Sequence, residues 1–149
     1  MGLKEICCEN VRIIRLKKGR CWVKKILIAD DNDDIRELLK TILFPLGHQI
    51  LFAKDGAETY SICRREKPHL VILDIMMPFF SGYQVLRRLK KDEMFKPHPK
   101  IIILSAKSQP EDIKQAEMLG CDFYIVKPFS NEELVRKVEE LLSSKDYTL

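Results

Sequence analysis

The sequence ILIADD at residues 26–31 joins an apolar run directly to two aspartates, Asp30 and Asp31. Three later runs also end in a polar side chain: LVILD at 70–74, IIILS at 101–105 and FYIVKP at 123–128. Short apolar runs between helical stretches are typical of buried parallel strands. The carboxyl ends of such strands line the ligand crevice of an open α/β sheet. The pattern therefore predicts that three carboxylates, a hydroxyl and an ammonium group meet at one edge of one sheet.

The segments between these runs have the periodicity of helices. After Asn32, and again after Ser130, apolar residues recur at steps of three and four and form one stripe. A more polar strand, His48 to Ala53, fits the outside of the sheet beside the first strand. Strand and helix alternate five times, which predicts an α/β fold with a doubly wound, flavodoxin-like, five-stranded parallel sheet in the order 2-1-3-4-5.

Four pairs of residues are typical of helix N-terminal caps, in which a short polar side chain is followed three residues later by Glu or Gln. They are Asp55 with Glu58, Ser81 with Gln84, Ser108 with Glu111 and Ser130 with Glu133. We expect a helix to begin after the first residue of each pair.

The net charge of +4 comes from the beginning of the chain. Residues 1–25 contain eight Lys or Arg and two Glu, whereas from residue 26 onward 20 acidic side chains outnumber 18 basic ones. This distribution predicts a basic N-terminal extension at 1–24, one domain at 25–145 and a short tail at 146–149. The slightly acidic domain gives no support to nucleic-acid binding, and we expect no nucleic-acid-binding domain.

Three interpretations of the extension remain open. Basic and apolar residues are interleaved between Val11 and Arg20, which is typical of an arm that contacts an anionic partner. The segment could instead be an addition without function. In the third interpretation translation starts at Val23, because the codons for the preceding residues would resemble a ribosome-binding sequence.

The cysteines and the hydropathy indicate a compartment. The five cysteines cannot all pair within the chain, and none has a Cys-x-x-Cys spacing, so reduced thiols are the simplest interpretation. No apolar stretch approaches the roughly 20 residues that a membrane-spanning helix needs. We therefore expect a cytoplasmic protein without a membrane span.

The predicted carboxylate cluster calls for a divalent metal ion, because crowded carboxylates repel one another unless a cation joins them. Each polar residue taken singly has a simpler interpretation. Asp31 could cap a helix, Ser105 could be a turn hydroxyl, Lys127 a solvated lysine and Tyr124 a packed aromatic. Their combination at the ends of neighbouring strands favours a joint chemical role.

Four blocks of the sequence resemble the response-regulator receiver domain of two-component signalling. The blocks are IADDN at 28–32, LDIMMP at 73–78 followed by Gly82 and Tyr83, LSA at 104–106, and YIVKPF at 124–129. They occur in the order and at the separations of that family, and the match covers residues 25 to 145. The chain is similar to the stand-alone, chemotaxis-regulator-like type.

The resemblance implies a phosphoacceptor rather than an enzyme, apart from assistance in its own phosphorylation and slow autodephosphorylation. Asp74 would accept a phosphoryl group from a histidine kinase or a histidine phosphotransfer protein. Asp31, Asp74 and the Met76 carbonyl would bind Mg²⁺ (or Mn²⁺), with Asp30 acting through a water molecule. Lys127 would offset phosphoryl charge.

The resemblance also implies a switch. Ser105 would donate a hydrogen bond to the bound phosphoryl group, and Tyr124 would rotate into the space that Ser105 leaves. The fourth predicted helix, the strand at 123–126 and the last helix would then change shape toward a downstream protein target. The Lys127–Pro128 peptide would be cis.

One loop departs from the family. Phe79 stands where glycine is common, although a bulky residue resists a positive φ. We expect Phe79 to be exposed beside Asp74 and to form part of a partner surface.

Other functions compete with that of a phosphoacceptor. The chain could be a phosphorelay intermediate or a receiver severed from a longer regulator. A phosphatase with an aspartyl nucleophile would carry a second aspartate at position 76, which is Met76 here. A flavodoxin-like cofactor binder would need a Gly-rich or hydroxyl-rich phosphate loop after the first strand, and the sequence has none there.

Overall fold

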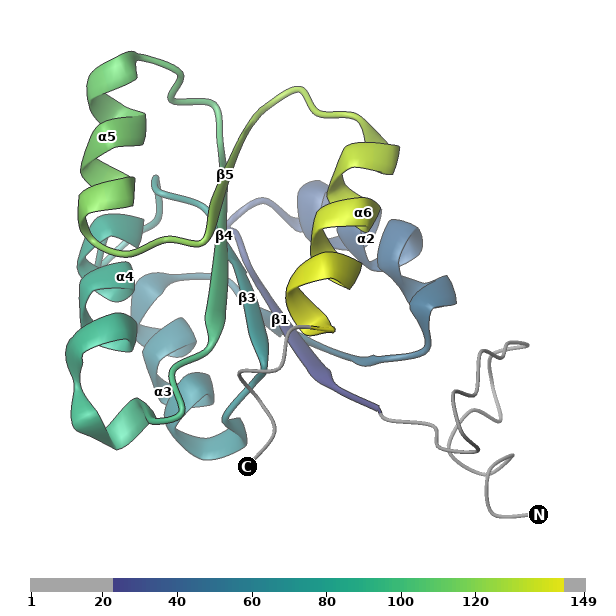
Figure 1. The fold of residues 1–149 in the computed structure, drawn as a ribbon, viewed down its shortest axis with the longest axis horizontal. Helices are drawn as coiled ribbons and strands as arrows, with labels where there is room; N and C mark the ends of the chain where they lie inside the picture. Colours follow the sequence, from purple (N-terminus) through teal and green to yellow (C-terminus); the bar gives the residue numbers. More distant parts are fainter. Residues whose placement is uncertain (1–22, 144–149) are drawn as a thin grey trace.

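The computed structural model describes residues 23–143, which form a parallel sheet of five strands (Figure 1). The strands are β1 (Lys25–Ala29), β2 (Gln49–Ala53), β3 (Leu70–Leu73), β4 (Lys100–Ser105) and β5 (Phe123–Val126). Their order is β2-β1-β3-β4-β5, and every neighbouring pair is parallel. The predicted fold class, strand order and edge position of the second strand are therefore confirmed.

Five helices cover the two faces of the sheet (Figure 1). One face carries α2 (Asp33–Leu43) and α6 (Asn131–Leu142), and the other carries α3 (Gly56–Glu66), α4 (Gly82–Lys91) and α5 (Pro110–Met118). Short 3-10 turns, Phe44–Leu46 and Glu93–Phe95, follow α2 and α4. Alternate residues of each central strand enter opposite cores, as Ile26 and Leu27 do. Both cores are apolar, so the strands are buried on both faces.

Three of the four predicted caps lie where the sequence places them. Asp55, Ser81 and Ser130 accept hydrogen bonds from the backbone of the third helical residue, and Ser81 with Gln84 forms the reciprocal capping box. The prediction for Ser108 and Glu111 is wrong. The capping residue is Gln109, which is paired with Asp112.

Pro110 explains this difference. Proline disfavours helical geometry in the residue before it, and its fixed φ suits the first helical position. Gln109 is accordingly extended, with φ −71° and ψ 147°, and α5 begins one residue later than expected.

The described range bears on two of the earlier predictions. Residues 1–22 and 144–149 lie outside it, and with them lie most of the predicted extension at 1–24 and the tail at 146–149. Within residues 23–143, no helix has the length and hydropathy to cross a membrane.

Candidate functional site

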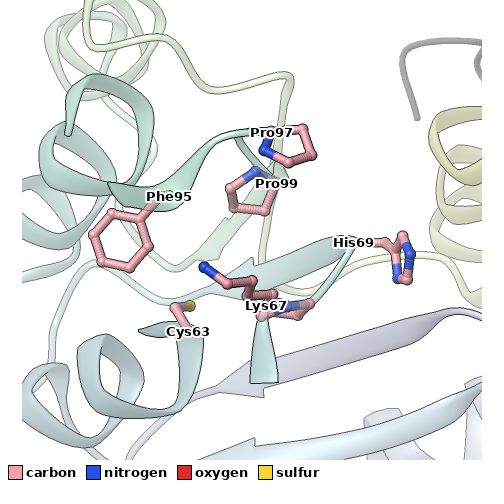
Figure 2. Close-up of a pocket in the computed structure, with 7 residues that line it drawn as sticks. Cys63, Lys67, His69, Phe95, Pro97 and Pro99 are labelled. Atoms are coloured by element: carbon pink, nitrogen blue, oxygen red, sulfur yellow. The ribbon is translucent and has the colours of Figure 1, made fainter. Parts of the chain in front are cut away.

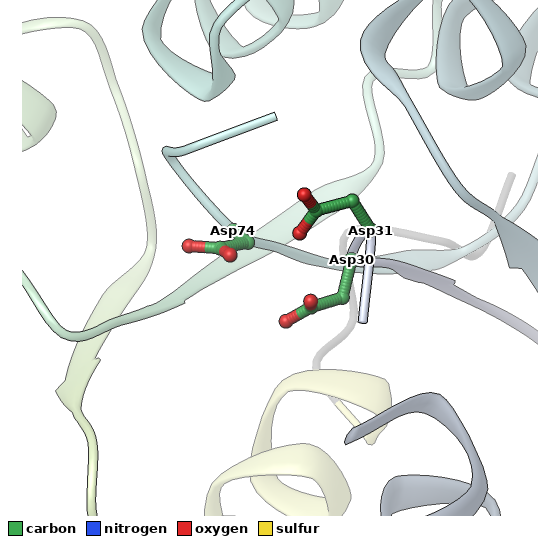
Figure 3. Close-up of side chains that lie close together, drawn as sticks. All are labelled: Asp30, Asp31 and Asp74. Atoms are coloured by element: carbon green, nitrogen blue, oxygen red, sulfur yellow. The ribbon is translucent and has the colours of Figure 1, made fainter. Parts of the chain in front are cut away.

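Three carboxylates meet at the carboxyl edge of the sheet (Figure 3). Ala29 and Leu73 are paired in register on β1 and β3, so the residues that follow them leave the sheet side by side. Carboxylate oxygens of Asp30, Asp31 and Asp74 lie within 4.8 Å of one another. Asp30 and Asp74 are 3% and 8% exposed, whereas Asp31 is open to solvent.

Lys127 brings one positive charge to this cluster from the end of β5. Its Nζ lies 2.9 Å from Oδ2 of Asp30 and 3.7 Å from Oδ2 of Asp74. The Lys127 N–H donates to the Ser105 carbonyl, which fixes the backbone at this point, and the Lys127–Pro128 peptide is cis as the resemblance implied. One ammonium group against three carboxylates leaves an excess of negative charge.

Burial dominates the electrostatics of Asp74 and raises the pKa of its carboxyl above the usual value. The nearby Lys127 ammonium lowers this pKa and the Asp30 carboxylate raises it, while hydrogen bonds from the Met76 N–H and the Ser105 hydroxyl lower it. The Met76 N–H lies 3.3 Å from Oδ1 of Asp74. A second cation among these oxygens would relieve the repulsion that remains.

The donor set fits Mg²⁺. It consists of carboxylate oxygens at the carboxyl edge of the sheet. Mg²⁺ prefers oxygen ligands and keeps several waters. Exposed Asp31 gives the cluster access to solvent. His and Cys, which would favour zinc, are absent from the cluster as it is found in residues 23–143.

A chain of hydrogen bonds leads from Ser105 to Tyr124. The hydroxyl of Ser105 accepts from the Lys107 N–H at 3.3 Å, and the Lys107 carbonyl accepts from the Tyr124 hydroxyl at 2.7 Å. Burial raises the pKa of the Tyr124 phenol to about 12, so the hydroxyl keeps its proton and donates. Tyr124 is half-buried and packs against the core of α3, α4 and α5.

Phe79 has a strained backbone in the loop after Asp74. Its φ is 69°, and the Phe80 N–H donates to the Pro78 carbonyl at 2.9 Å, which makes a three-residue turn centred on Phe79. Turns of this kind with a positive central φ are rare and strained. The side chain is 79% exposed, in agreement with the expected exposure.

Gly82 is a positioning residue that our sequence analysis did not explain. Its N–H donates to the Ile75 carbonyl at 2.8 Å. A Cβ at this position would lie 2.4 Å from the Asp74 carbonyl oxygen and 2.6 Å from Cα of Ile75. The start of α4 therefore presses on the backbone of Asp74, and Gly82 in the resembling block was the signal that could have revealed it.

A small hollow at the amino edge of the sheet is a poor candidate for chemistry (Figure 2). Its volume is about 80 Å³, and Cys63, Phe95 and three prolines contribute to its lining. Burial raises the pKa of the Cys63 thiol to about 12, so this sulfur is not a nucleophile at neutral pH. The other cysteine in residues 23–143, Cys121, is also a free thiol, and burial raises its pKa to about 11.

Comparisons with known proteins agree with the fold. The family model described as the response regulator receiver domain matches residues 26–139. A probable transcriptional regulator, ycf27 of Porphyridium aerugineum, is 42% identical over 123 residues, covering 83% of this chain and 50% of the relative. The phosphate regulon transcriptional regulatory protein PhoB of Pseudomonas aeruginosa is 40% identical over 119 residues, covering 80% and 52%.

A solved structure shares the fold of this chain. It is the receiver domain of the sensor histidine kinase PA1611 of Pseudomonas aeruginosa, with a magnesium ion coordinated in its active-site cleft. The identity is 24%, the TM-score is 0.74, and the match covers 83% of this chain and all of the other.

These relatives correct one prediction. The chain spans about half the length of the curated relatives it matches, and both relatives above are named transcriptional regulators. The prediction that there is no nucleic-acid-binding domain is therefore wrong as judged from the proteins that this chain resembles. The charge of the receiver-like domain gives no information about a separate segment of such a regulator. It therefore cannot exclude a nucleic-acid-binding domain.

Proposed function

The chain belongs to the response regulator receiver domain family, and we propose that it is a phosphoacceptor in which Asp74 receives a phosphoryl group from a phosphohistidine. The donor would be a histidine kinase or a histidine phosphotransfer protein of a cytoplasmic two-component system. One observation carries this proposal: three carboxylates within 4.8 Å of one another share a single ammonium group, Lys127.

The transfer requires little of the protein beyond positioning and charge. An oxygen of the Asp74 carboxylate forms a bond to phosphorus, and the bond between phosphorus and the donor imidazole nitrogen breaks. The imidazole leaves with that electron pair and takes a proton from water. Lys127 then lies close enough to Asp74 to offset charge on the transferred group.

Mg²⁺ (or Mn²⁺) would be held by Asp31, Asp74 and the Met76 carbonyl, with Asp30 acting through a water molecule, and would neutralise charge on the acid cluster and the phosphoryl group. Asp30 also accepts from the Asn32 N–H at 2.9 Å, which orients its carboxylate toward the cluster. The burial of Asp74 limits the access of bulk water to the acyl phosphate, which favours a slow autodephosphorylation. An aspartyl phosphatase finds less support, because an exposed methionine occupies position 76.

The hydrogen bonds from Ser105 through Lys107 to Tyr124 support a switch. A phosphoryl oxygen that attracts the Ser105 hydroxyl would release the Lys107 N–H, and the loop between β4 and α5 would relax. Tyr124 loses its acceptor when this loop moves. The surface made by α5, β5 and α6 would then change shape and bind a downstream protein partner differently. Exposed Phe79 would contact the phosphoryl donor.

Acetyl phosphate with Mg²⁺ tests the proposal. We expect the intact mass of the full chain to rise by one phosphoryl group, and to stay unchanged without the metal. The Asp74→Asn variant should gain no mass, whereas Asp34→Asn, which alters an exposed acid on α2, should be modified normally. A normal gain in Asp74→Asn, or one that persists in a chelator, would overturn the proposal.

A further inference from the structure

A groove of about 440 Å³ lies against α3 and α4 and shares no residue with the acid cluster. Two small side chains of α3, Ala57 and Ser61, lie one helical turn apart along it and leave room for a ligand. Phe80 and Tyr60 supply aromatic rings, and three arginines complete the lining. The groove therefore combines apolar surface with positive charge.

The positive charge is largely unneutralised. The arginines are Arg64, Arg65 and Arg88, and no acidic side chain of residues 23–143 lines the groove. Glu66 pairs with Arg65 at 3.4 Å, but it also pairs with Lys25 at 3.0 Å. Arg64 and Arg88 make no ion pair with any residue in the described range.

Helix dipoles explain only part of this charge. Arg64, Arg65 and Arg88 lie in the last turns of their helices, where cations are favourable. A dipole effect does not require aromatic rings in the same groove as the arginines. The rings point instead to a surface that recognises a ligand with both charge and apolar bulk.

The groove is pre-organised by ring contacts. The Arg88 guanidinium lies 4.8 Å from the centre of the Tyr60 ring. The Tyr60 and Phe95 rings are nearly perpendicular, with their centres 5.2 Å apart. A stacked guanidinium keeps its N–H donors in its plane, where they can bind a carboxylate. Tyr60 thus holds Arg88 in place before any ligand arrives.

The other side of the groove is also rigid. The Gly56 N–H donates to the Pro78 carbonyl at 3.3 Å, and a Cβ at Gly56 would lie 2.2 Å from the Phe80 carbonyl oxygen. The loop that carries Phe80 is therefore pressed against the start of α3. Phe80 is still 42% exposed, so its ring is available to a partner.

We propose that this groove binds an acidic peptide segment of a partner protein, with one aromatic or large aliphatic side chain among its carboxylates. Carboxylates match the planar donors of arginine, and the apolar side chain would lie against Phe80 and Tyr60. Nucleic acid also carries charge that arginine binds, but from residue 26 onward acidic side chains outnumber basic ones by 20 to 18, which disfavours a polyanion along a wide surface. A short acidic segment would contact only the arginines of the groove and not the acidic surface elsewhere.

The test uses the full chain labelled with ¹⁵N and a short glutamate-rich peptide that carries one central tryptophan. We expect amide shifts in α3, at Phe80 and at Arg88. Replacement of the glutamates by glutamine, or of the tryptophan by alanine, should weaken binding about tenfold or more, and added salt should weaken it further.

Charge-reversal variants separate the groove from general basicity. Arg64→Glu should weaken peptide binding at least about tenfold, and Arg64→Glu with Arg88→Glu about a hundredfold. Arg87→Glu changes an exposed arginine of α4 outside the groove and should leave binding nearly unchanged. Arg64 has no partner in the described range to lose, so its variant keeps the test valid if the double variant unfolds.

Four results would overturn the proposal: no peptide binding at millimolar concentration, equal losses in Arg64→Glu and Arg87→Glu, shifts confined to another surface, or tighter binding of single-stranded oligothymidylate than of the peptide. The test does not depend on Asp74, because the peptide carries no phosphoryl donor. Its failure would leave the acceptor proposal unchanged.

Discussion

Polar groups at the two edges of the sheet differ in how well they are paired. At the amino edge, ring nitrogens of His48 and His69 accept hydrogen bonds from the backbone of Lys24 and Lys25 at 3.1 and 3.0 Å. At the carboxyl edge, carboxylates crowd around one lysine beside a loop with a positive φ at Phe79. At the amino edge the histidine rings pair with backbone N–H groups. At the carboxyl edge like charges lie close together beside a strained backbone, and a bound ligand could relieve both effects.

The largest effect should come from disturbing the backbone at the carboxyl edge. Gly82→Ala places a Cβ 2.4 Å from the Asp74 carbonyl oxygen, so either α4 or the backbone of Asp74 at the end of β3 must move. We expect a loss of about 3 kcal/mol in the free energy of unfolding, measured with urea, and slower phosphorylation by acetyl phosphate.

A glycine far from the site provides the control. Gly47 has a φ of 82° after the turn that follows α2, and Gly47→Ala should cost about 1 kcal/mol through backbone strain. Phosphorylation of that variant should keep its normal rate. A similar loss of rate in both variants would show that Gly82 does not position Asp74.

Magnesium should stabilise the carboxyl edge specifically. At a free concentration one hundred times its Kd, binding to the native state alone adds about 2.7 kcal/mol to the free energy of unfolding. Asp31→Asn should lose most of this gain, because it removes an exposed carboxylate from the cluster. Thermal unfolding with and without Mg²⁺ measures the difference, and Asp34→Asn should behave like the unmodified chain. Equal gains in both variants would contradict the assigned metal site.

Acid should weaken the amino edge. Burial, then the charge of Lys24 and then His69, lower the pKa of His48 to about 4. The unfolded chain therefore binds more protons than the folded one between about pH 6.5 and 4, so stability falls as the pH falls through this window. A protonated ring also cannot accept from the Lys24 N–H.

The measurement is the free energy of unfolding between pH 7 and pH 4.5. We expect His48 to account for about 1–2 kcal/mol of the loss, after allowance for its partial exposure. His48→Asn should flatten the profile, while Gln49→Ala, an exposed uncharged neighbour, should not. An unchanged slope in His48→Asn would mean that other groups cause the pH dependence.

The smallest effect should come from relieving strain. Phe79→Gly accepts the φ of 69° without a steric penalty, and the exposed ring buries little surface. A gain of about 0.5–1 kcal/mol is expected, because the strain relieved exceeds the added entropy of the unfolded chain. Transfer from a phosphorylated histidine protein should slow, whereas transfer from acetyl phosphate should not. If Phe79→Gly changed the rate with both donors by the same factor relative to the unmodified chain, or changed neither rate, Phe79 would not be part of a donor surface.

Much of the fold followed from local patterns. The apolar runs 26–29 and 70–73 predicted buried strands, and the polar residues after them predicted which side chains meet. The alternation of strands with amphipathic helices restricted the topology to few solutions. Local sequence also located Asp55, Ser81 and Ser130 as caps.

The remaining features depend on three-dimensional contacts or on local rules that compete with the helix-cap pattern. The clash that excludes a side chain at Gly82, and the stacking of Arg88 on Tyr60, join parts of the chain that no periodicity relates. Ser108 and Glu111 fit the helix-cap pattern, but Pro110 sets the first helical residue and makes Gln109 the cap. The hydrogen bonds of His48 and His69 have no sequence signature, because their donors are the backbone N–H groups of Lys24 and Lys25 at the start of β1.

The most direct test of the central claim locates the acyl phosphate. The chain is phosphorylated with acetyl phosphate and Mg²⁺, reduced with borohydride and mapped by peptide mass spectrometry, since reduction converts a phosphorylated carboxyl into an alcohol. We expect a reduced side chain at Asp74 and at no other aspartate. Reduction at Asp30 or Asp31, or phosphate that survives on a serine or histidine, would contradict it.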